Sequence, residues 1–328
     1  MTLVLTASTL ETLASMAETI TAVERGFGDI ARGTALQPGP LSLHLPSSEA
    51  RYLLMAGLAE TQNLAAVKLL SDIPANQLKG LPTQRSSILL ADRHTGETLA
   101  LLDGRVPTRI RTAAASAVAS KYLARPDSST LGLVGAGALA IAHLEAMLHV
   151  IPLRTVVVWS RSSSTLAAFE AKTAHHPIEL VKASSVQEAV EAADVLCTLT
   201  PSVEPLVRGE WFRPGLHVNA VGARPRPTHR EIDAAGMSGS RVFVDSLQTA
   251  VEKSGDLMMA VGEGAMSMDD VQGELGRIIS GEITGRTSDQ DVTLFNSVGI
   301  GMLDLAIGRL LYDAAILHGL GTSIDMSR

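Results

Sequence analysis

The sequence of 328 residues predicts an α/β protein with a doubly wound parallel sheet in one domain and a second, α+β domain. Three observations support this fold class. The chain is longer than one ordinary domain and shorter than three. Beyond residue 128, short apolar segments alternate regularly with helical ones, which is typical of a parallel sheet covered by helices. Before residue 107, short apolar runs are separated by Pro, Asn and Gly, which favours antiparallel hairpins.

The composition excludes several classes of protein. Apolar residues make up 46% and charged residues 19% of the chain, and no apolar run is long enough to span a membrane. The first residues lack the basic segment of a secretory signal, and the single cysteine, Cys197, suits a reducing compartment, so we expect a cytoplasmic protein. A net charge of -7 disfavours nucleic acid as the main partner. We therefore expect a globular protein with neither nucleic acid nor a membrane as its main partner, although a local basic pocket could still bind a small anion.

The elements of the first domain follow from apolar periodicity. Helical spacing over residues 9 to 32 predicts an amphipathic helix that opens the fold. Five strands are expected next, in LSLHLP, YLLMAG, AAVKLL, SSILLAD and ETLALLD. An Ala-rich segment at 107 to 124 predicts the helix that enters the next domain, and the tail from 298 to 320 predicts a long apolar helix with no strand after it. We assign residues 1–120 and 298–328 to the first domain, and 121–297 to the second, doubly wound domain.

A glycine motif marks the start of the nucleotide-binding domain. Gly135, Gly137, Ala138, Leu139 and Ala140 fit G-x-G-x-x-G/A, directly after the apolar strand LGLV and at the start of a helix. The first glycine permits a tight turn, the second lets the backbone approach a pyrophosphate, and the helix N-terminus offers free N–H groups to it. A glycine pair alone often marks only a turn, but this context predicts a Rossmann dinucleotide site.

The end of the next strand indicates which dinucleotide is bound. Ser160, Arg161 and Ser163 stand where NAD-specific folds place a carboxylate on the ribose hydroxyls. A guanidinium with neighbouring hydroxyls suits a 2′-phosphate. The sequence therefore favours NADPH, with NADH as the alternative if Arg161 is an incidental loop residue.

Several segments resemble the ornithine cyclodeaminase and mu-crystallin family over roughly residues 60 to 312. They are RTAAASAVASKYL, LVGAGALA, SSVQEAVEAADVLCTLT, GEWFRPGLHVNAVGA, REID, RVFVDS and EKSGDL. The chain is most similar to the ketimine reductase branch. The resemblance implies a homodimer whose N-terminal substrate and dimerisation domain is completed by the C-terminal helix.

The resemblance also implies site residues. Lys68 matches the active-site lysine of the family, and Arg111 matches the arginine that holds the substrate carboxylate. A guanidinium orients a carboxylate well, and an ammonium can polarise or protonate an imine. Without the resemblance, an edge-strand lysine and a salt-bridged helical arginine would be the simpler interpretations. The cofactor contacts that it implies, besides the glycine motif, are Thr83, Arg111, Thr198, Thr200, Val221 and Ser297.

Two departures from the family pattern bear on the substrate. Family members carry an arginine in a P-x-R context shortly after the first helix, where this chain has Gln37-Pro38-Gly39-Pro40. Either His44 or Arg51 replaces it, or the substrate is bound by fewer charges. Ornithine cyclodeaminases place a catalytic aspartate after the NAVG-like segment, where this chain has Ala223-Arg224. The second departure disfavours cyclodeamination.

We therefore expect NADPH-dependent reduction of a cyclic ketimine carboxylate, pyrroline-2-carboxylate or piperideine-2-carboxylate, to proline or pipecolate. An ornithine or lysine cyclodeaminase, an alanine-type amino acid dehydrogenase and a non-catalytic NADPH-dependent ligand binder stay open as alternatives. Cys197 is interpreted as a small core residue. His175 and His176 have no neighbours at ligand spacing, so no metal site is expected.

Overall fold

The computed structural model describes residues 1–326 and divides the chain into two compact units. The first unit comprises Met1–Arg111 and the chain from Gly299 onward, and the second comprises Thr112–Val298. The boundary falls inside helix α3 (Arg105–Leu123). The α/β class is confirmed, because the second unit contains a parallel sheet with helices and the first unit adds a sheet and helices of its own.

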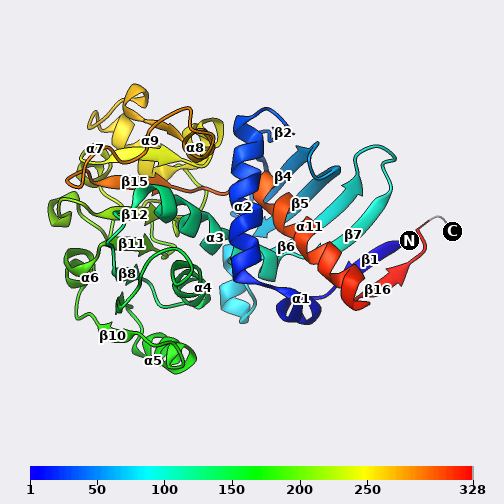
Figure 1. The fold of residues 1–328 in the computed structure, drawn as a ribbon, viewed down its shortest axis with the longest axis horizontal. Helices are drawn as coiled ribbons and strands as arrows, with labels where there is room; N and C mark the ends of the chain where they lie inside the picture. The colour runs from blue at the N-terminus through cyan, green and yellow to red at the C-terminus, as the bar shows by residue number, and fades with distance from the viewer. Residues whose placement is uncertain (327–328) are drawn as a thin grey trace. The chain divides into compact units, whose positions relative to one another are not determined.

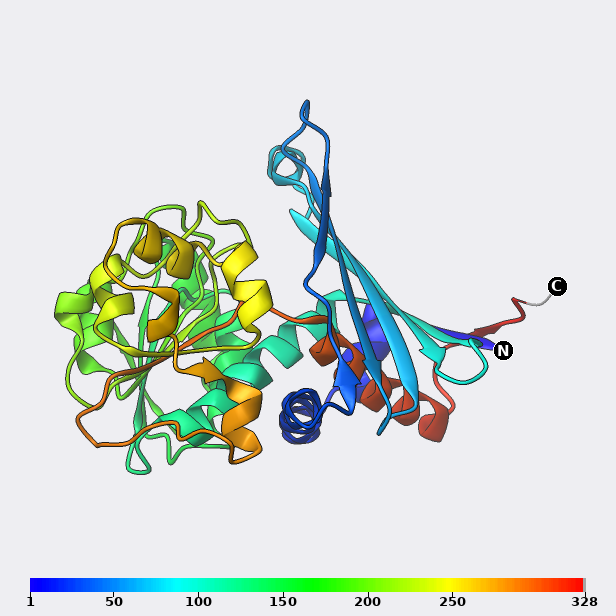
Figure 2. The same ribbon diagram turned by 90° about the horizontal axis from the view of Figure 1, so that it is seen from above.

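The first unit contains an eight-stranded sheet in the order β16-β1-β7-β6-β5-β4-β2, with β3 paired to β4. Its neighbours are antiparallel except for β1 and β7, which run parallel. Figure 2 shows the long central strands of this sheet in blue and cyan. The strands are β1 (Thr2–Leu5), β2 (Ala35–Leu36), β3 (Leu41–His44), β4 (Arg51–Ala59), β5 (Leu64–Asp72), β6 (Gln84–Asp92), β7 (Thr98–Asp103) and β16 (Thr322–Ile324), with a 3-10 helix, η1 (Pro74–Lys79), between β5 and β6.

Helices α1 (Ala7–Leu13), α2 (Met16–Ala31) and α11 (Gly301–His318) cover one face of this sheet (Figure 1). The expected single helix over residues 9 to 32 is wrong, because Ser15 caps a new helix: its hydroxyl accepts a hydrogen bond from the Glu18 N–H. Strand β1 also precedes these helices. The expectation that no strand follows the C-terminal helix is wrong as well, since β16 pairs antiparallel with β1. Its three exposed residues are too few for an apolar pattern to reveal.

The second unit contains a sheet of eight strands, all parallel, in the order β10-β9-β8-β11-β12-β15-β13-β14. From β8 the chain builds outward through β9 to β10, then crosses to β11 on the other side of β8, so the strand order reverses between β8 and β11. Open α/β sheets bind ligands at the carboxyl ends of the strands beside such a reversal. The strands are β8 (Thr130–Val134), β9 (Thr155–Trp159), β10 (Glu179–Lys182), β11 (Val195–Thr198), β12 (His217–Ala220), β13 (Arg241–Val244), β14 (Gly273–Glu274) and β15 (Thr293–Asn296).

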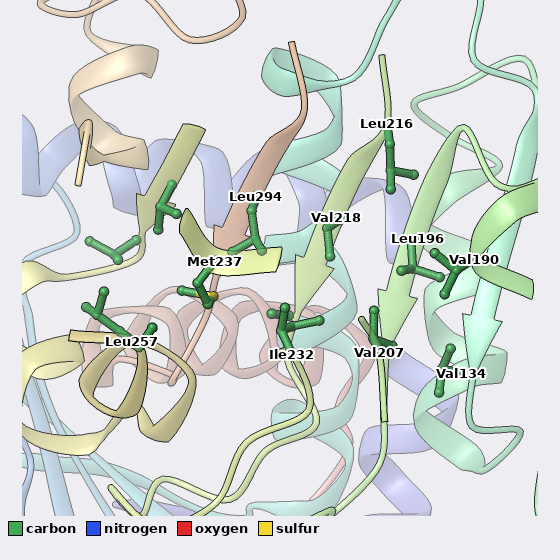
Figure 3. Close-up of a cluster of buried hydrophobic side chains, with 14 of the residues drawn as sticks. Val134, Val190, Leu196, Val207, Leu216, Val218, Ile232, Met237, Leu257 and Leu294 are labelled. Carbon is green, nitrogen blue, oxygen red and sulfur yellow. The ribbon is translucent and has the colours of Figure 1, made fainter. Parts of the chain in front are cut away.

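Helices flank both faces of this parallel sheet (Figure 1). Buried apolar side chains form two main clusters between the sheet and these helices. One cluster includes Val134, Val218 and Leu294 from three strands together with Met237 and Leu257 from helices (Figure 3). The helices are α4 (Ala138–Met147), α5 (Ser163–Thr173), α6 (Val186–Ala192), α7 (Ala234–Ser238), α8 (Leu247–Lys253), α9 (Gly255–Gly262) and α10 (Leu275–Ile279), with 3-10 helices η2 (Gly209–Trp211) and η3 (Met268–Asp270). Within residues 1–326, no helix is long and apolar enough to cross a membrane.

Candidate active site

Three charged side chains meet in the interior of the first unit. Lys68 lies in the middle of β5, Asp304 in the first turn of α11, and Arg111 in α3. The Asp304 carboxylate pairs with both cations, through Oδ2 with Lys68 Nζ at 2.6 Å and through Oδ1 with Arg111 Nε at 3.2 Å. The side chains of Lys68, Asp304 and Arg111 are 0%, 1% and 6% exposed. The structure therefore brings together the two residues that the family resemblance singled out and adds a carboxylate between them.

Close backbone contact between α11 and the sheet places Asp304 above β5. A Cβ atom on Gly301 would lie 2.3 Å from the Ala56 carbonyl oxygen, and one on Gly57 would lie 3.1 Å from Met302 Cα. Only glycine at both positions allows the helix to start this close to β4. The Met302 N–H donates a hydrogen bond of 3.3 Å to Gln37 Oε1, so the segment that lacks the family's P-x-R arginine contacts the start of the same helix through Gln37.

The electrostatics of the cluster leave an excess of positive charge. Burial lowers the pKa of Lys68 from 10.5 to about 8, against the attraction of Asp304 and with the repulsion of Arg111. Two cations share one carboxylate, so a second carboxylate from a bound molecule would balance the charge. Gly299, with φ of 86°, lies against the guanidinium, since a Cβ there would be 3.2 Å from Arg111 Nη2. The absence of a side chain at this position leaves the guanidinium uncrowded.

The carboxyl ends of the parallel strands in the second unit carry the glycine loop. Gly135, with φ of 112°, makes the turn after β8, and its N–H donates to the Trp159 carbonyl oxygen at 2.9 Å. Gly137 is the N-cap of α4, and no heavy atom lies within 4 Å of the position that a Cβ would occupy. Ala138 and Leu139 then begin the helix. An open backbone at a helix N-terminus fits a pyrophosphate group.

The other predicted cofactor residues of the second unit follow the carboxyl ends of neighbouring strands. Ser160 and Arg161 come after β9, and Ser163 begins α5, whose N-cap is Ser162. Thr198 ends β11 and Thr200 follows it, Val221 follows β12, and Ser297 follows β15 and donates to Asp245. Because parallel strands end at one edge, these residues share an edge with the glycine loop. Thr83 belongs to the first unit, just before β6, and its carbonyl oxygen accepts a hydrogen bond from the Ile73 N–H.

The two candidate replacements for the missing arginine lie farther along the sheet. His44 in β3 is the cross-strand partner of Arg51 in β4. Arg51 is paired in register with Asp72, and Met55 with Lys68, so Arg51 is four residues, roughly 13 Å, from the register of Lys68. Cys197 is buried in the core, where burial raises the pKa of its thiol. That environment matches the small core residue expected of it.

Sequence reasoning missed two carboxylates. Asp304 interrupts the apolar pattern of the C-terminal helix in GMLDLAIG, and a charge among buried residues is the signal that could have exposed it. Glu231 in the REID segment is fully buried and accepts hydrogen bonds from two strand-end loops. The REID segment itself carries no sign of this arrangement, because the partners of Glu231 lie elsewhere in the sequence.

The model of the ornithine cyclodeaminase/mu-crystallin family matches residues 1–318. The chain belongs to this family. The match includes the glycine loop, Lys68, Arg111 and Asp304, and it extends the resemblance seen in the sequence to nearly the whole chain.

Individual relatives share most of their length with the chain. It is 36% identical to the ketimine reductase mu-crystallin of Mus musculus over 277 residues, which are 84% of each protein. The structure of Thermococcus litoralis Delta(1)-pyrroline-2-carboxylate reductase in complex with NADH and L-proline matches with a TM-score of 0.92 and 36% identity, covering 98% of this chain and 100% of that one. An archaeal alanine dehydrogenase dimer with bound NAD matches with a TM-score of 0.92 and 32% identity, covering 99% of each chain.

Proposed function

We propose that this protein is an NADPH-dependent reductase of a cyclic ketimine carboxylate, such as pyrroline-2-carboxylate or piperideine-2-carboxylate, and forms the corresponding L-amino acid, proline or pipecolate. The observation that carries the proposal is the buried cluster of Lys68, Asp304 and Arg111, in which two cations share one carboxylate. A cyclic imino acid presents one carboxylate beside the C=N carbon, which suits this excess of positive charge. The similarity to a pyrroline-2-carboxylate reductase and to a ketimine reductase supports the same chemistry.

Each member of the cluster has a distinct role in this proposal. Arg111 binds the substrate carboxylate through its terminal nitrogens, while its Nε is held by Asp304. Lys68 donates a proton toward the imine nitrogen, and a pKa of about 8 leaves it protonated yet acidic enough to transfer that proton near neutral pH. Asp304 keeps both side chains in place and limits the loss of charge from Lys68. The nicotinamide cofactor, when bound, supplies the hydride.

The glycine loop fits a dinucleotide, and the residues after β9 support NADPH over NADH. Ser160 and Ser162 hydroxyls accept hydrogen bonds from backbone N–H groups of the turn, and Arg161 between them is exposed. The first residues after β9, from Ser160 to Ser164, include no carboxylate that would repel a 2′-phosphate. The two solved structures named above contain NADH and NAD, so both cofactors belong in the test.

We propose a homodimer formed through the sheet face of the first unit that α1, α2 and α11 leave uncovered. Val67, Leu89 and Leu101 lie side by side on that face in three neighbouring strands and are 42%, 39% and 41% exposed. An apolar patch of this kind marks an interaction site, and the alanine dehydrogenase relative is a dimer. Leu89→Glu should shift the sedimentation coefficient to that of a monomer, whereas Val203→Glu, at an exposed position of the second unit, should not.

The deciding experiment follows NADPH oxidation by absorbance with pyrroline-2-carboxylate and piperideine-2-carboxylate, and repeats each assay with NADH. Rapid turnover of a cyclic imine that exceeds turnover of open-chain keto acids with ammonia supports the proposal. Cofactor binding without turnover of either imine contradicts it, and if open-chain keto acids with ammonia are not reduced either, the result favours a ligand-binding protein. We also place the enzyme in the cytoplasm, on the cysteine usage described above.

An alanine-type amino acid dehydrogenase is the second candidate. The similarity to the archaeal alanine dehydrogenase favours it, and the same buried cations would hold the carboxylate of pyruvate. The two activities differ in their need for ammonia, because a cyclic imine already contains its nitrogen. Reduction of pyruvate that depends on ammonia concentration, with no turnover of the cyclic imines, would establish the dehydrogenase instead.

A further inference from the structure

A buried carboxylate, Glu231, joins two strand-end loops of the second unit. Its Oε1 accepts hydrogen bonds from the N–H and the hydroxyl of Thr200, both at 2.6 Å. Its Oε2 accepts from the Thr198 hydroxyl and the Gly222 N–H, both at 2.8 Å. Thr198 and Thr200 belong to the end of β11, and Gly222 follows β12, so one side chain receives four hydrogen bonds from two neighbouring loops.

These loops pack against each other and against the glycine loop through their backbones. A Cβ atom on Gly222 would lie 2.2 Å from the Thr200 nitrogen, and one on Gly135 would lie 3.0 Å from the Leu199 carbonyl oxygen. With no side chain between them, the three loops have little room to move independently. A shift of the loop after β11 would therefore also shift the glycine loop, because their backbones are in contact.

Glu231 is itself held by a second buried carboxylate. Asp256, in the first turn of α9, accepts hydrogen bonds from the N–H groups of Glu231 and Ile232 at 2.8 and 2.9 Å. Its other oxygen accepts from Asn296 at the end of β15. A helix start and a further strand end are thus tied to the backbone of Glu231.

This arrangement is unfavourable for stability alone. Both carboxyls are fully buried or nearly so, and burial raises the pKa of Glu231 to about 7 and that of Asp256 to about 6. Apolar residues of similar volume generally stabilise a core at least as well as buried charged groups. The hydrogen bonds of these carboxyls lie at the sheet edge that carries the glycine loop. This location indicates that the carboxyls position the loops there, a role that apolar packing would not fulfil.

We propose that Glu231 is a positioning residue for the cofactor, which holds the loops after β11 and β12 in the arrangement that receives the nicotinamide half of the dinucleotide. This inference rests on the proposed function, because it presumes that a nicotinamide cofactor binds at this edge. The pyrophosphate end belongs to the glycine loop after β8, and the second half of a dinucleotide extends past the strand-order reversal to the strands beyond it. Thr198 and Thr200 then act by joining Glu231, since their hydroxyls already donate to it.

The test compares Glu231→Gln with wild type and with Glu282→Gln. Glu231→Gln keeps the shape of the side chain but places an amide NH2, itself a donor, against two of the groups that donate to Glu231 in wild type. Glu282 is an exposed glutamate of the same unit that accepts from Ser280 and Arg277. Cofactor affinity is measured by the fluorescence of bound NADPH and NADH, and kcat and the KM for the imine by absorbance at 25 °C. We expect Glu231→Gln to weaken cofactor binding roughly 10- to 100-fold and to lower kcat, without changing the KM for the imine. Glu282→Gln should match wild type in cofactor affinity, kcat and KM.

Two outcomes overturn the inference. If Glu231→Gln lowers the melting temperature but binds cofactor and turns over like wild type below that temperature, Glu231 is only structural. If wild type binds neither NADPH nor NADH, the proposed function and this inference fail together, whereas cofactor binding without imine turnover removes the proposed reaction alone. Should Glu231→Gln not fold, Thr200→Val, which removes one donor, must weaken cofactor binding roughly 3- to 10-fold, and unchanged binding rejects the role.

Discussion

Asp304→Asn tests the buried ion cluster, because it removes the carboxylate that Lys68 and Arg111 share while keeping the side-chain shape. In wild type, the pKa of Lys68 is already lowered to about 8 by burial, and loss of Asp304 lowers it further. At pH 7, Lys68 in the variant can lose its proton and become neutral. The loss of unfolding free energy that comes from Lys68 is therefore limited to the difference between its wild-type pKa and pH 7, one unit or about 1 kcal/mol.

The Arg111 guanidinium cannot reduce its cost in this way, since arginine stays protonated at all relevant pH values. Losing the charged hydrogen bond between Arg111 and Asp304 costs about 2–3 kcal/mol. Together the two parts destabilise the protein by about 3–4 kcal/mol at pH 7, which agrees with the range of about 3–5 kcal/mol for breaking a buried pair. The Lys68 part disappears as pH rises past its wild-type pKa, because Lys68 is then neutral in both proteins, so the loss should shrink to about 2–3 kcal/mol at pH 9.5.

Equilibrium urea unfolding at pH 7 and pH 9.5, followed by circular dichroism, measures both values. Asp313→Asn is the matched control, because Asp313 lies on the same helix in an exposed pair with Arg309 and should change stability by less than about 1 kcal/mol. A loss for Asp304→Asn no greater than for this control, or one that grows with pH, would refute the reasoning.

Three further predictions concern activity and cofactor binding. Arg111→Ala should raise the KM for the imine by roughly 100-fold and weaken NADPH binding far less, because the glycine loop still holds the cofactor; titration and steady-state kinetics would show both effects, and a normal KM would rule out Arg111 as the group that binds the substrate carboxylate. The value of kcat/KM should fall about tenfold per pH unit above pH 8 as Lys68 loses its proton, and a profile flat to pH 10 would exclude Lys68 as the donor. Arg161→Ala should weaken NADPH binding roughly tenfold and leave NADH binding unchanged; equal effects on both would assign Arg161 no phosphate contact.

The sequence predicted the parallel sheet well because its signals are local. The apolar segments LGLV, TVVVW and VLCTLT each contain a largely buried strand, and helices alternating with such strands predict one class of fold. The loop of Gly135 and Gly137 is likewise predicted from adjacent residues, the apolar strand before it and the helix after it. The break between α1 and α2 was not predicted, because helical spacing continues across Ser15, and only the cap geometry shows that a new helix begins there.

By itself, the sequence determined the α/β class and the position of the glycine loop, and its resemblance to a family singled out Lys68 and Arg111 as candidate site residues. The tertiary structure alone decided what these residues do together. Asp304 follows Arg111 by 193 positions in the chain and meets it only because Gly57 and Gly301 let α11 start directly on β4. Glu231 similarly meets its partners only when β11 and β12 lie side by side. Charges that are partnered across such distances leave no periodic signal, since their positions depend on how finished elements pack.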